Sequence, residues 1–190
     1  MATKGRVLIT GAGGLVGGVL REALASEYDL SGVDIKPVAG FSSLRADTTD
    51  LDAMQPAFEG VDAVVDLASV PDQFSPWDTV YGNNIPSTFN ALEASRRAGV
   101  QRVVFASSNH VTGMYEGDRP YSDIVAGRYE GLDSSRLPLI TTEMPIRPDG
   151  PYGIAKAFGE AAGRYFSDEH GLSVICLRIG TVNKENRPLT

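Results

Sequence analysis

The sequence predicts an α/β fold in which a doubly wound parallel sheet carries helices on both faces. Short apolar runs alternate with longer segments along the chain, and this alternation is typical of repeated strand-helix-strand units. Several of the runs are apolar throughout, as strands covered on both faces require. The expected strands are residues 6–10, 29–33, 43–46, 63–67, 102–106 and 172–178. The expected helices are 14–26, 50–58, 77–98 and 151–169, the last with Pro151 in its first turn.

Composition is that of one ordinary domain spanning residues 1–190, with 42% hydrophobic and 22% charged residues. The net charge of -7 and the lack of any Lys/Arg run argue against a nucleic-acid partner. Cys176 lies in an apolar run, where a buried and inert thiol is expected. The apolar run near the N-terminus is too short for a signal peptide or a membrane span, so we expect a cytoplasmic protein with no membrane partner.

Residues 109–150 interrupt the strand and helix pattern. This stretch is rich in Gly, Pro, Asp and Tyr and is far longer than the usual connection in a compact domain. Long loops of this kind are typically functional. We therefore expect an active-site loop here.

A glycine motif follows the first expected strand directly and opens the first expected helix. Gly11 permits a tight turn, Gly14 lets the backbone approach a pyrophosphate, and Gly17 lets helix and strand pack closely. This context predicts a Rossmann-type domain that binds a dinucleotide. The expected contacts from this motif are Gly11, Gly13, Gly14, Leu15, Val16 and Gly17.

Acidic residues after the second and third strands bear on the choice of dinucleotide. Asp34 lies about 20 residues beyond the motif, where a carboxylate accepts hydrogen bonds from ribose hydroxyls and repels a 2′-phosphate. This favours NAD over NADP, although Lys36 could help to hold a phosphate. Asp47 either faces the adenine or belongs to a surface turn.

Tyr152 and Lys156 stand one turn apart on the same face of the last expected helix. A substrate hydroxyl loses a proton as its carbon gives hydride to a nicotinamide, so such a reaction needs a base, and an ammonium group lowers the pKa of a nearby phenol. The alternative is a packed ring beside a surface charge.

Polar residues also follow the expected strand 102–106, at the edge where ligands of such sheets bind. Ser108 is the expected hydrogen-bond partner of the reacting oxygen, whereas Ser107 could turn into the fold. Asn109 and His110 either contact a substrate or cap the loop. No spacing typical of metal ligands is present, so no metal is expected.

These motifs together resemble the extended or atypical short-chain dehydrogenases/reductases, in their NAD-dependent epimerase/dehydratase branch. Within that branch, segments 105–110, 76–78 and 178–180 resemble the uronate dehydrogenases and the archaeal NAD-dependent glucose-6-phosphate dehydrogenases. The resemblance implies that Tyr152 is the base, that Lys156 lowers its pKa and holds the nicotinamide ribose, and that Ser108 aligns the substrate hydroxyl. It adds Asp47, Thr48, Leu67, Ala68, Ser69, Asn84 and Tyr152 to the expected cofactor contacts, beside Lys156.

The resemblance also implies a reaction: NAD-dependent oxidation of a hexuronate or hexose phosphate at C1, which gives a lactone. Ser69, Ser108, Asn109, His110, Tyr152 and Arg178 would then contact the substrate. An Arg guanidinium suits a carboxylate or a phosphate equally well, but Arg178 could instead form a structural ion pair. Helices 77–98 and 151–169 could pair two copies into a homodimer.

The chain departs from the family pattern in two places. It reads Ile85-Pro86-Ser87-Thr88 where the family has a glycine before the threonine, and it stops at Thr190, where relatives continue with a region that closes the sugar site. Two alternatives therefore stay open: a nucleotide-sugar epimerase or dehydratase that recycles its hydride, and a non-catalytic dinucleotide-binding module.

Overall fold

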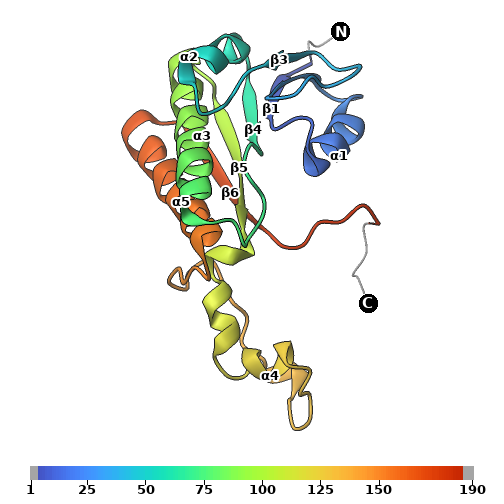
Figure 1. Cartoon of the computed structure of the whole chain (residues 1–190), viewed down its shortest axis with the longest axis vertical. Coiled ribbons are helices and arrows are strands. Elements are labelled where there is room, and N and C mark those ends of the chain that lie inside the picture. Colours follow the sequence, from blue (N-terminus) through green and yellow to red (C-terminus); the bar gives the residue numbers. More distant parts are fainter. Residues whose placement is uncertain (1–3, 186–190) are drawn as a thin grey trace.

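A computed structural model describes residues 4–185 and places a six-stranded parallel sheet at the centre of the molecule (Figure 1). The strand order is β3-β2-β1-β4-β5-β6, so successive strands are added to one side of β1 as far as β3 and to its other side from β4 onward. This change makes a topological switch point at the carboxyl ends of β1 and β4. The strands are β1 (Arg6–Thr10), β2 (Asp29–Asp34), β3 (Ser43–Arg45), β4 (Ala63–Asp66), β5 (Arg102–Ser108) and β6 (Ser173–Ile179). The predicted doubly wound α/β fold is confirmed.

The helices divide between the two faces of this sheet. Helix α1 (Leu15–Leu24) lies on one face, and α2 (Leu51–Met54), α3 (Trp77–Ala98) and α5 (Pro151–His170) lie on the other (Figure 1). Helices α3 and α5 each end at a glycine, because Gly99 and Gly171 take the left-handed conformation that stops a helix and that glycine favours. Among residues 4–185, no helix is long and apolar enough to cross a membrane.

Two predicted elements differ from the structure in instructive ways. The expected helix 50–58 starts with Asp50, whose side chain accepts from Ala53 N at 3.0 Å, but it tightens into the 3-10 helix η1 (Gln55–Phe58) at Pro56. A proline cannot donate the backbone hydrogen bond of a continuing α-helix. Strand β5 runs two residues past the predicted end because Ser107 and Ser108 pair with Arg178 and Ile179 of β6.

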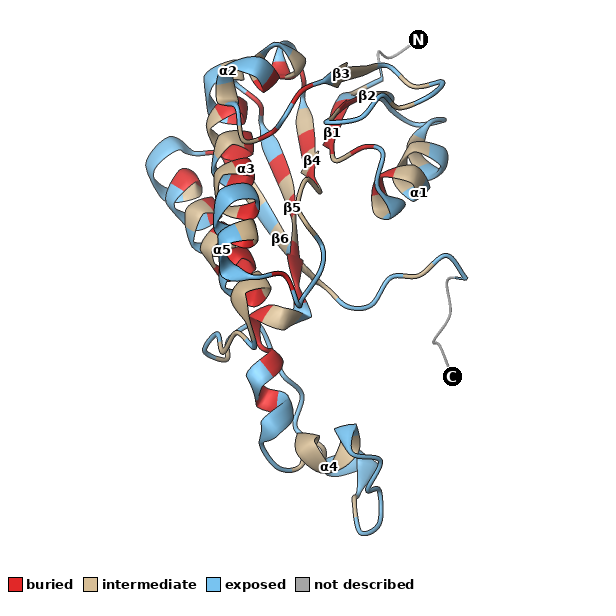
Figure 2. Ribbon diagram, in the orientation of Figure 1, coloured by how far each residue is buried: buried red, intermediate tan, exposed pale blue. Residues whose placement is uncertain are grey.

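The main hydrophobic core lies between the sheet and the α2, α3 and α5 layer (Figure 2). Strand residues Leu8, Val64 and Val103 are fully buried there, against Leu92 of α3 and Phe166 of α5. Burying one large aliphatic or aromatic side chain contributes about 1.5–3 kcal/mol, so this layer dominates the stability of the fold. On the opposite face, beyond α1, Ile175 and Leu177 of β6 stay 42% and 47% exposed.

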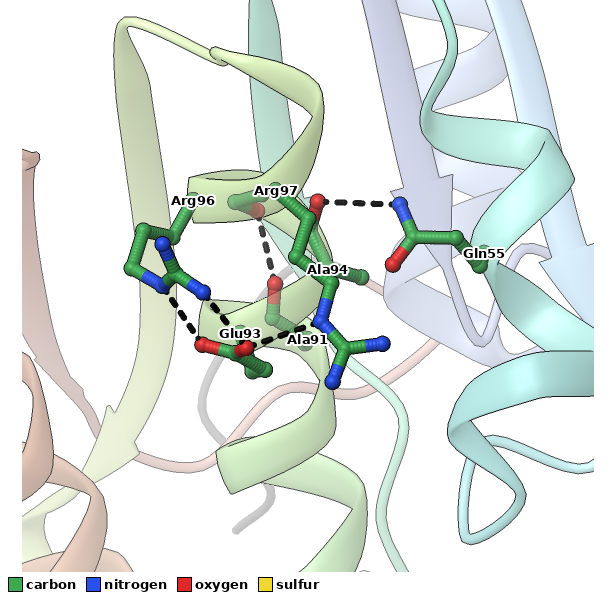
Figure 3. Close-up of polar contacts among 7 residues, drawn as sticks. Gln55, Ala91, Glu93, Ala94, Arg96 and Arg97 are labelled. Carbon is green, nitrogen blue, oxygen red and sulfur yellow. Dashed lines mark hydrogen bonds and ion pairs between the residues drawn. The ribbon is translucent and has the colours of Figure 1, made fainter.

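Polar groups tie the last turns of α3 to its surroundings (Figure 3). Glu93 accepts from Arg96 Nε at 2.7 Å and from Arg97 Nε at 2.8 Å, and the hydrogen bonds from these guanidinium groups lower the pKa of Glu93 to about 2. Gln55 Nε2 donates to Ala94 O at 3.2 Å and so links η1 to α3. The arginines also lie where positive charge complements the helix dipole.

The expected active-site loop, residues 109–150, consists of two parts. Its ends stay at the sheet, through η2 (Asn109–Val111) and the residues that lead into α5. Its middle contains η3 (Gly113–Gly117), α4 (Tyr121–Val125) and η4 (Ser134–Arg136), and projects away from the sheet (Figure 1). Met114 N donates to Arg147 O at 3.0 Å and Arg147 N donates to Val111 O at 2.9 Å. We call these two crossing segments, 111–115 and 145–147, the neck.

Candidate active site at the carboxyl edge of the sheet

A cavity of about 1080 Å³ opens at the carboxyl ends of the strands. It runs from the turn after β1 to the start of α5, across the switch point, where doubly wound sheets bind their ligands. Most predicted site residues line it: Gly11, Gly13, Gly14, Leu15, Val16, Gly17, Asp34, Asp47, Thr48, Leu67, Ala68, Ser69, Ser108, Asn109, His110, Tyr152 and Lys156. Asn84 and Arg178 are the two predicted residues that do not line it.

The glycine motif forms a cradle that side chains would fill. Gly11 has a φ of +65°, and a Cβ there would come within 3.1 Å of the backbone of Leu67 and Ala68. A Cβ on Gly17 would lie 2.8 Å from the carbonyl oxygens of Gly11 and Ala12. The motif therefore needs glycine for the turn and for close packing of α1 on β1. Its exposed backbone fits the pyrophosphate of a dinucleotide.

Asp34 completes the cradle at the end of β2. Its Oδ2 accepts from Gly13 N at 2.9 Å and its Oδ1 accepts from Lys36 N at 2.9 Å. These backbone donors fix the carboxylate at the edge of the cavity.

Asp47 and Thr48 take different roles after β3. Asp47 is exposed and accepts from Thr49 N at 2.9 Å and from Thr49 Oγ1 at 2.8 Å, so it organises its own turn. Thr48 is buried and donates to Ser87 Oγ of α3 at 2.8 Å. Both still line the cavity, and Ser87 joins them there.

Two buried ionisable groups lie beneath the centre of the cavity. Asp66, the last residue of β4, accepts from Thr10 Oγ1 at 2.6 Å, and Thr10 Oγ1 in turn accepts from the backbone N of Leu67 and Ala68 at 3.1 Å. Burial raises the pKa of Asp66 to about 6, against the opposing effects of the Thr10 hydrogen bond and the Lys156 charge. Sequence reasoning missed Asp66, although a carboxylate that ends an apolar strand is itself a signal.

Lys156 reaches the cavity from α5 but is only 3% exposed. Its Nζ lies 5.0 Å from the centroid of the Phe105 ring and 5.5 Å from that of the Tyr152 ring. Burial lowers the pKa of Lys156 to about 8, and the negative charge of Asp66 acts in the opposite direction. An amine held this way is poised to exchange its proton near neutral pH.

Tyr152 stands at the entrance of α5, one turn before Lys156. Burial raises the pKa of Tyr152, and hydrogen bonds with Ser69 and Ser108 only partly oppose this rise. Desolvation of the phenolate outweighs these nearby polar groups, and the lowering of this pKa by Lys156 stays a prediction. Tyr152, Ser108 and Ser69 thus lie close together in the cavity, and their roles stay predictions.

The two serines at the end of β5 point to different places, as expected. Ser107 Oγ donates to Glu160 Oε1 at 2.6 Å, inside the fold. Ser108 accepts from His110 N at 3.2 Å and so caps η2 while it reaches Tyr152. His110 Nδ1 lies 2.7 Å from Asp149 Oδ2, and the ring of His110 meets that of Tyr152 edge-on at 5.6 Å.

The structure gives Asn84 and Arg178 structural partners. Asn84 is buried and clamps the loop after β4, since its Oδ1 accepts from Val70 N at 2.8 Å and its Nδ2 donates to Val70 O at 3.1 Å. Arg178 forms a bidentate ion pair with Glu160, at 2.8 and 2.7 Å. The alternative of a structural ion pair for Arg178 is therefore the one that the structure bears out, and the sequence at Ile85-Pro86 does not prevent α3 from continuing.

Several residues of the cavity were not predicted. They come from the loop after β4 and from the exit of β6: Val70, Pro71, Asp72, Gln73, Phe74, Ile179, Gly180, Thr181 and Val182. The rule that ligands bind at the carboxyl edge would have found these segments. Glu116 and Asp149 also line the cavity, and no local signal marks them because they reach it only through folding of the 109–150 segment.

Comparison with known proteins places this geometry in context. The sequence profile described as NAD dependent epimerase/dehydratase family matches residues 7–186. L-arabinose 1-dehydrogenase (NAD(P)(+)) of Haloferax volcanii is 44% identical, over 92% of this chain and 66% of that protein. NAD-dependent glucose-6-phosphate dehydrogenase of the same organism is 37% identical, over 96% of this chain and 70% of that protein.

A solved structure agrees with these relatives. The crystal structure of uronate dehydrogenase from Agrobacterium tumefaciens superposes with a TM-score of 0.77 and 34% identity, over 95% of this chain and 62% of that chain. The chain thus spans between 62% and 70% of the length of these three proteins.

Proposed function

Because the chain belongs to the NAD dependent epimerase/dehydratase family, we propose that it binds NAD and oxidises a sugar at C1 to a lactone, with Tyr152 as the base. One observation carries the proposal: Tyr152, Lys156 and Ser108 line the same cavity as the glycine cradle. A dinucleotide bound at the cradle and a sugar beside Tyr152 would share that space. The names of the relatives, which are dehydrogenases of L-arabinose and glucose 6-phosphate, support sugar oxidation.

The chain's own residues would hold NAD in three places. The backbone of Gly11 to Gly14 would receive the pyrophosphate, Asp34 would accept from the adenosine ribose, and Lys156 would hold the nicotinamide ribose. Bound NAD supplies the acceptor for the hydride that leaves the sugar. A carboxylate at Asp34 favours NAD, while the name of the Haloferax volcanii relative includes NADP, so both nucleotides belong in the test.

Tyr152 would take the proton of the C1 hydroxyl as the C1 hydrogen leaves as hydride, so that the C1–O bond becomes the carbonyl of a lactone. Ser108 would hydrogen-bond the reacting oxygen, since it already contacts the Tyr152 hydroxyl. Burial keeps the pKa of Tyr152 high in the chain alone. Positive charge from Lys156 and from the oxidised nicotinamide would stabilise the phenolate when NAD is bound.

The charges at the cavity bear on which class of sugar the chain would oxidise. A hexuronate or hexose phosphate was expected because Arg178 could hold an acidic group, but Arg178 pairs with Glu160 and does not line the cavity. Asp72, Glu116 and Asp149 line it instead. An uncharged aldose therefore joins the hexuronate and the hexose phosphate as a candidate substrate.

Removal of the Tyr152 hydroxyl tests the proposal. We expect Tyr152→Phe to lower kcat/KM by about 10²-fold or more, the usual contribution of a general base, with NAD affinity unchanged. NADH absorbance would be followed with glucuronate, galacturonate, glucose 6-phosphate, L-arabinose and UDP-glucose, and NAD affinity by calorimetry. Tyr165→Phe is the matched control, because Tyr165 lies on the same helix and is 54% exposed.

Other outcomes would favour the alternatives. Conversion of UDP-glucose without net NADH would identify an epimerase that recycles its hydride. NAD binding with no turnover of any sugar would leave a dinucleotide-binding module and overturn the proposal that this chain is an enzyme by itself.

A further inference from the structure

Asp149 occupies a space that two glycines leave for it. A Cβ on Gly113 would overlap Asp149 Oδ2, and a Cβ on Gly153 would overlap His110 O and come within 3.2 Å of Asp149 Oδ1. Neither glycine has a left-handed φ, so backbone conformation does not explain them. The Asp149 carboxylate is therefore tightly packed, and it lies in the part of the cavity that contains His110 and Tyr152.

The partner of this carboxylate is His110, 39 residues away in the chain. Backbone hydrogen bonds hold the two segments together: Arg147 N donates to Val111 O at 2.9 Å, and Asp149 N donates to His110 O at 3.4 Å. His110 N is also fixed, since it donates to Ser108 Oγ at 3.2 Å. The backbone and ring of His110 are therefore both constrained.

This contact determines which ring nitrogen carries the proton. His110 Nδ1 lies 2.7 Å from Asp149 Oδ2, and an ionised carboxylate can only accept a hydrogen bond. In neutral His110 the proton is therefore on Nδ1, and Nε2 has only a lone pair. Both residues line the cavity, with 22% and 29% of their side chains exposed, and the His110 ring contacts the ring of Tyr152.

We propose that Asp149 is a positioning residue that makes His110 Nε2 a hydrogen-bond acceptor for a sugar hydroxyl next to the reacting carbon. The inference rests on the proposed function and narrows its substrate. A hydroxyl can donate to Nε2, whereas an ionised carboxylate or phosphate oxygen has no proton to donate and would be repelled by the lone pair. His110 therefore selects a hydroxyl at this place on the sugar.

The position of the proton can be measured without turnover. The chain contains only two histidines, so ¹⁵N spectra at about pH 8, where an ordinary imidazole is neutral, would resolve His110, with His170 as an internal reference. We expect protonated Nδ1 and unprotonated Nε2 in the native chain, and a shift of the proton to Nε2 in Asp149→Ala. Asp52→Ala is the matched control because the Asp52 side chain is 97% exposed.

The spectra can overturn the inference in two ways. The inference fails if His110 in the native chain carries its proton on Nε2, or if the proton stays on Nδ1 in Asp149→Ala while the His170 signals show an intact fold. Where Asp149→Ala disturbs the fold, Asp149→Asn keeps the shape of the side chain and removes its charge, and it should weaken the preference for Nδ1.

Kinetics then test the role in recognition. Asp149→Ala should lower kcat/KM by roughly 10–100-fold, the range for partners that orient functional histidines, with NAD affinity unchanged. A series of monodeoxy sugars would then be compared with the parent sugar. In the variant, removal of the hydroxyl that faces His110 should cause no further loss of kcat/KM. An equal loss on every analogue would contradict the acceptor role. If no sugar is oxidised at all, the proposed function fails, and the spectra alone decide where the proton lies.

Discussion

At the scale of single residues, the site holds opposite charges that burial disfavours. Asp66 has a pKa of about 6 in the fold against 3.8 as its ordinary value, so its contribution to stability is present below pH 3.8 and is lost as the pH rises through about 6. Lys156 has a pKa of about 8 against 10.5, so its contribution is present above pH 10.5 and is lost as the pH falls through about 8. Between about pH 6 and about pH 8 both groups are charged in the fold. The desolvation of the two charges costs free energy of folding, and their mutual attraction offsets part of that cost.

The Asp66→Asn variant separates these two groups. Because the carboxylate raises the pKa of Lys156 against the effect of burial, we expect the variant to shift that pKa below about 8. The chain has only four lysines, Lys4, Lys36, Lys156 and Lys184, so ¹³C-labelled lysine side chains can be titrated individually by NMR. The other three should titrate as in the native chain. An unchanged or higher pKa for Lys156 would show that Asp66 does not act on it.

Residue types and the family resemblance together predicted most of the residues that line the cavity, because the carboxyl ends of parallel strands meet at one edge. The pairs that decide the chemistry could not be predicted this way. Only folding brings Asp149 into contact with His110 and Glu160 into contact with Arg178, and brings Asp66 near enough to Lys156 for their charges to interact. For Arg178 the sequence left two roles open, and it contains nothing to show that a glutamate on α5 would accept from Nε and one Nη of this side chain.

At the scale of secondary-structure elements, the close approach of α5 to the sheet positions the candidate catalytic residues. A Cβ on Gly159 would overlap the Phe105 ring of β5, and one on Gly163 would lie 2.8 Å from Val174 Cγ1 of β6. Since Tyr152 and Lys156 belong to the same helix, its distance from the sheet sets their position in the cavity.

Two glycine-to-alanine changes in helices should therefore have opposite effects. Gly159→Ala should lower the free energy of unfolding by about 1–3 kcal/mol, the cost of overpacking a core, and should lower activity as α5 moves. Gly82→Ala in α3 meets nothing within 4 Å and should raise it by about 0.4–1 kcal/mol. Urea denaturation of both variants makes the comparison. Equal effects would mean that α5 is not held close by Gly159.

Periodicity predicted α3 to the residue and α5 to within one residue, because both are long and end at glycine. It was less accurate where local geometry competes with the pattern. Pro56 tightens the predicted second helix, and pairing with β6 extends β5 past the point where its apolar run stops. The contents of the 109–150 segment have no periodic signal, so η2, η3, α4 and η4 could not be predicted.

At the scale of the whole molecule, the two faces of the sheet are unequal (Figure 2). The face under α3 and α5 holds the core, whereas the β6 side of the other face leaves Ile175 and Leu177 partly exposed. The sequence suggested strands covered on both faces. The described residues bear this out for β1, next to α1, and not for β6.

A matched pair of leucines measures this difference. Leu8→Ala removes a fully buried side chain of β1 and should cost about 2–5 kcal/mol. Leu177→Ala removes one that is 47% exposed in β6 and should cost less than about 1 kcal/mol. Chemical denaturation of the 190-residue chain would measure both changes in the free energy of unfolding. Similar costs would mean that something covers the β6 face in solution.

The neck of the 109–150 segment makes the part beyond it an exchangeable insert in evolutionary terms. Its two segments are joined by the hydrogen bonds between Met114, Arg147 and Val111, and Tyr115 Oη donates to Pro145 O at 3.0 Å. Doubling the length of a flexible loop costs only about 0.6 kcal/mol, so the tip can lengthen or shorten while the neck still delivers His110 and Asp149 to the cavity. Lineages built on this plan can thus change the length of the projecting tip without rebuilding the chemistry of the site.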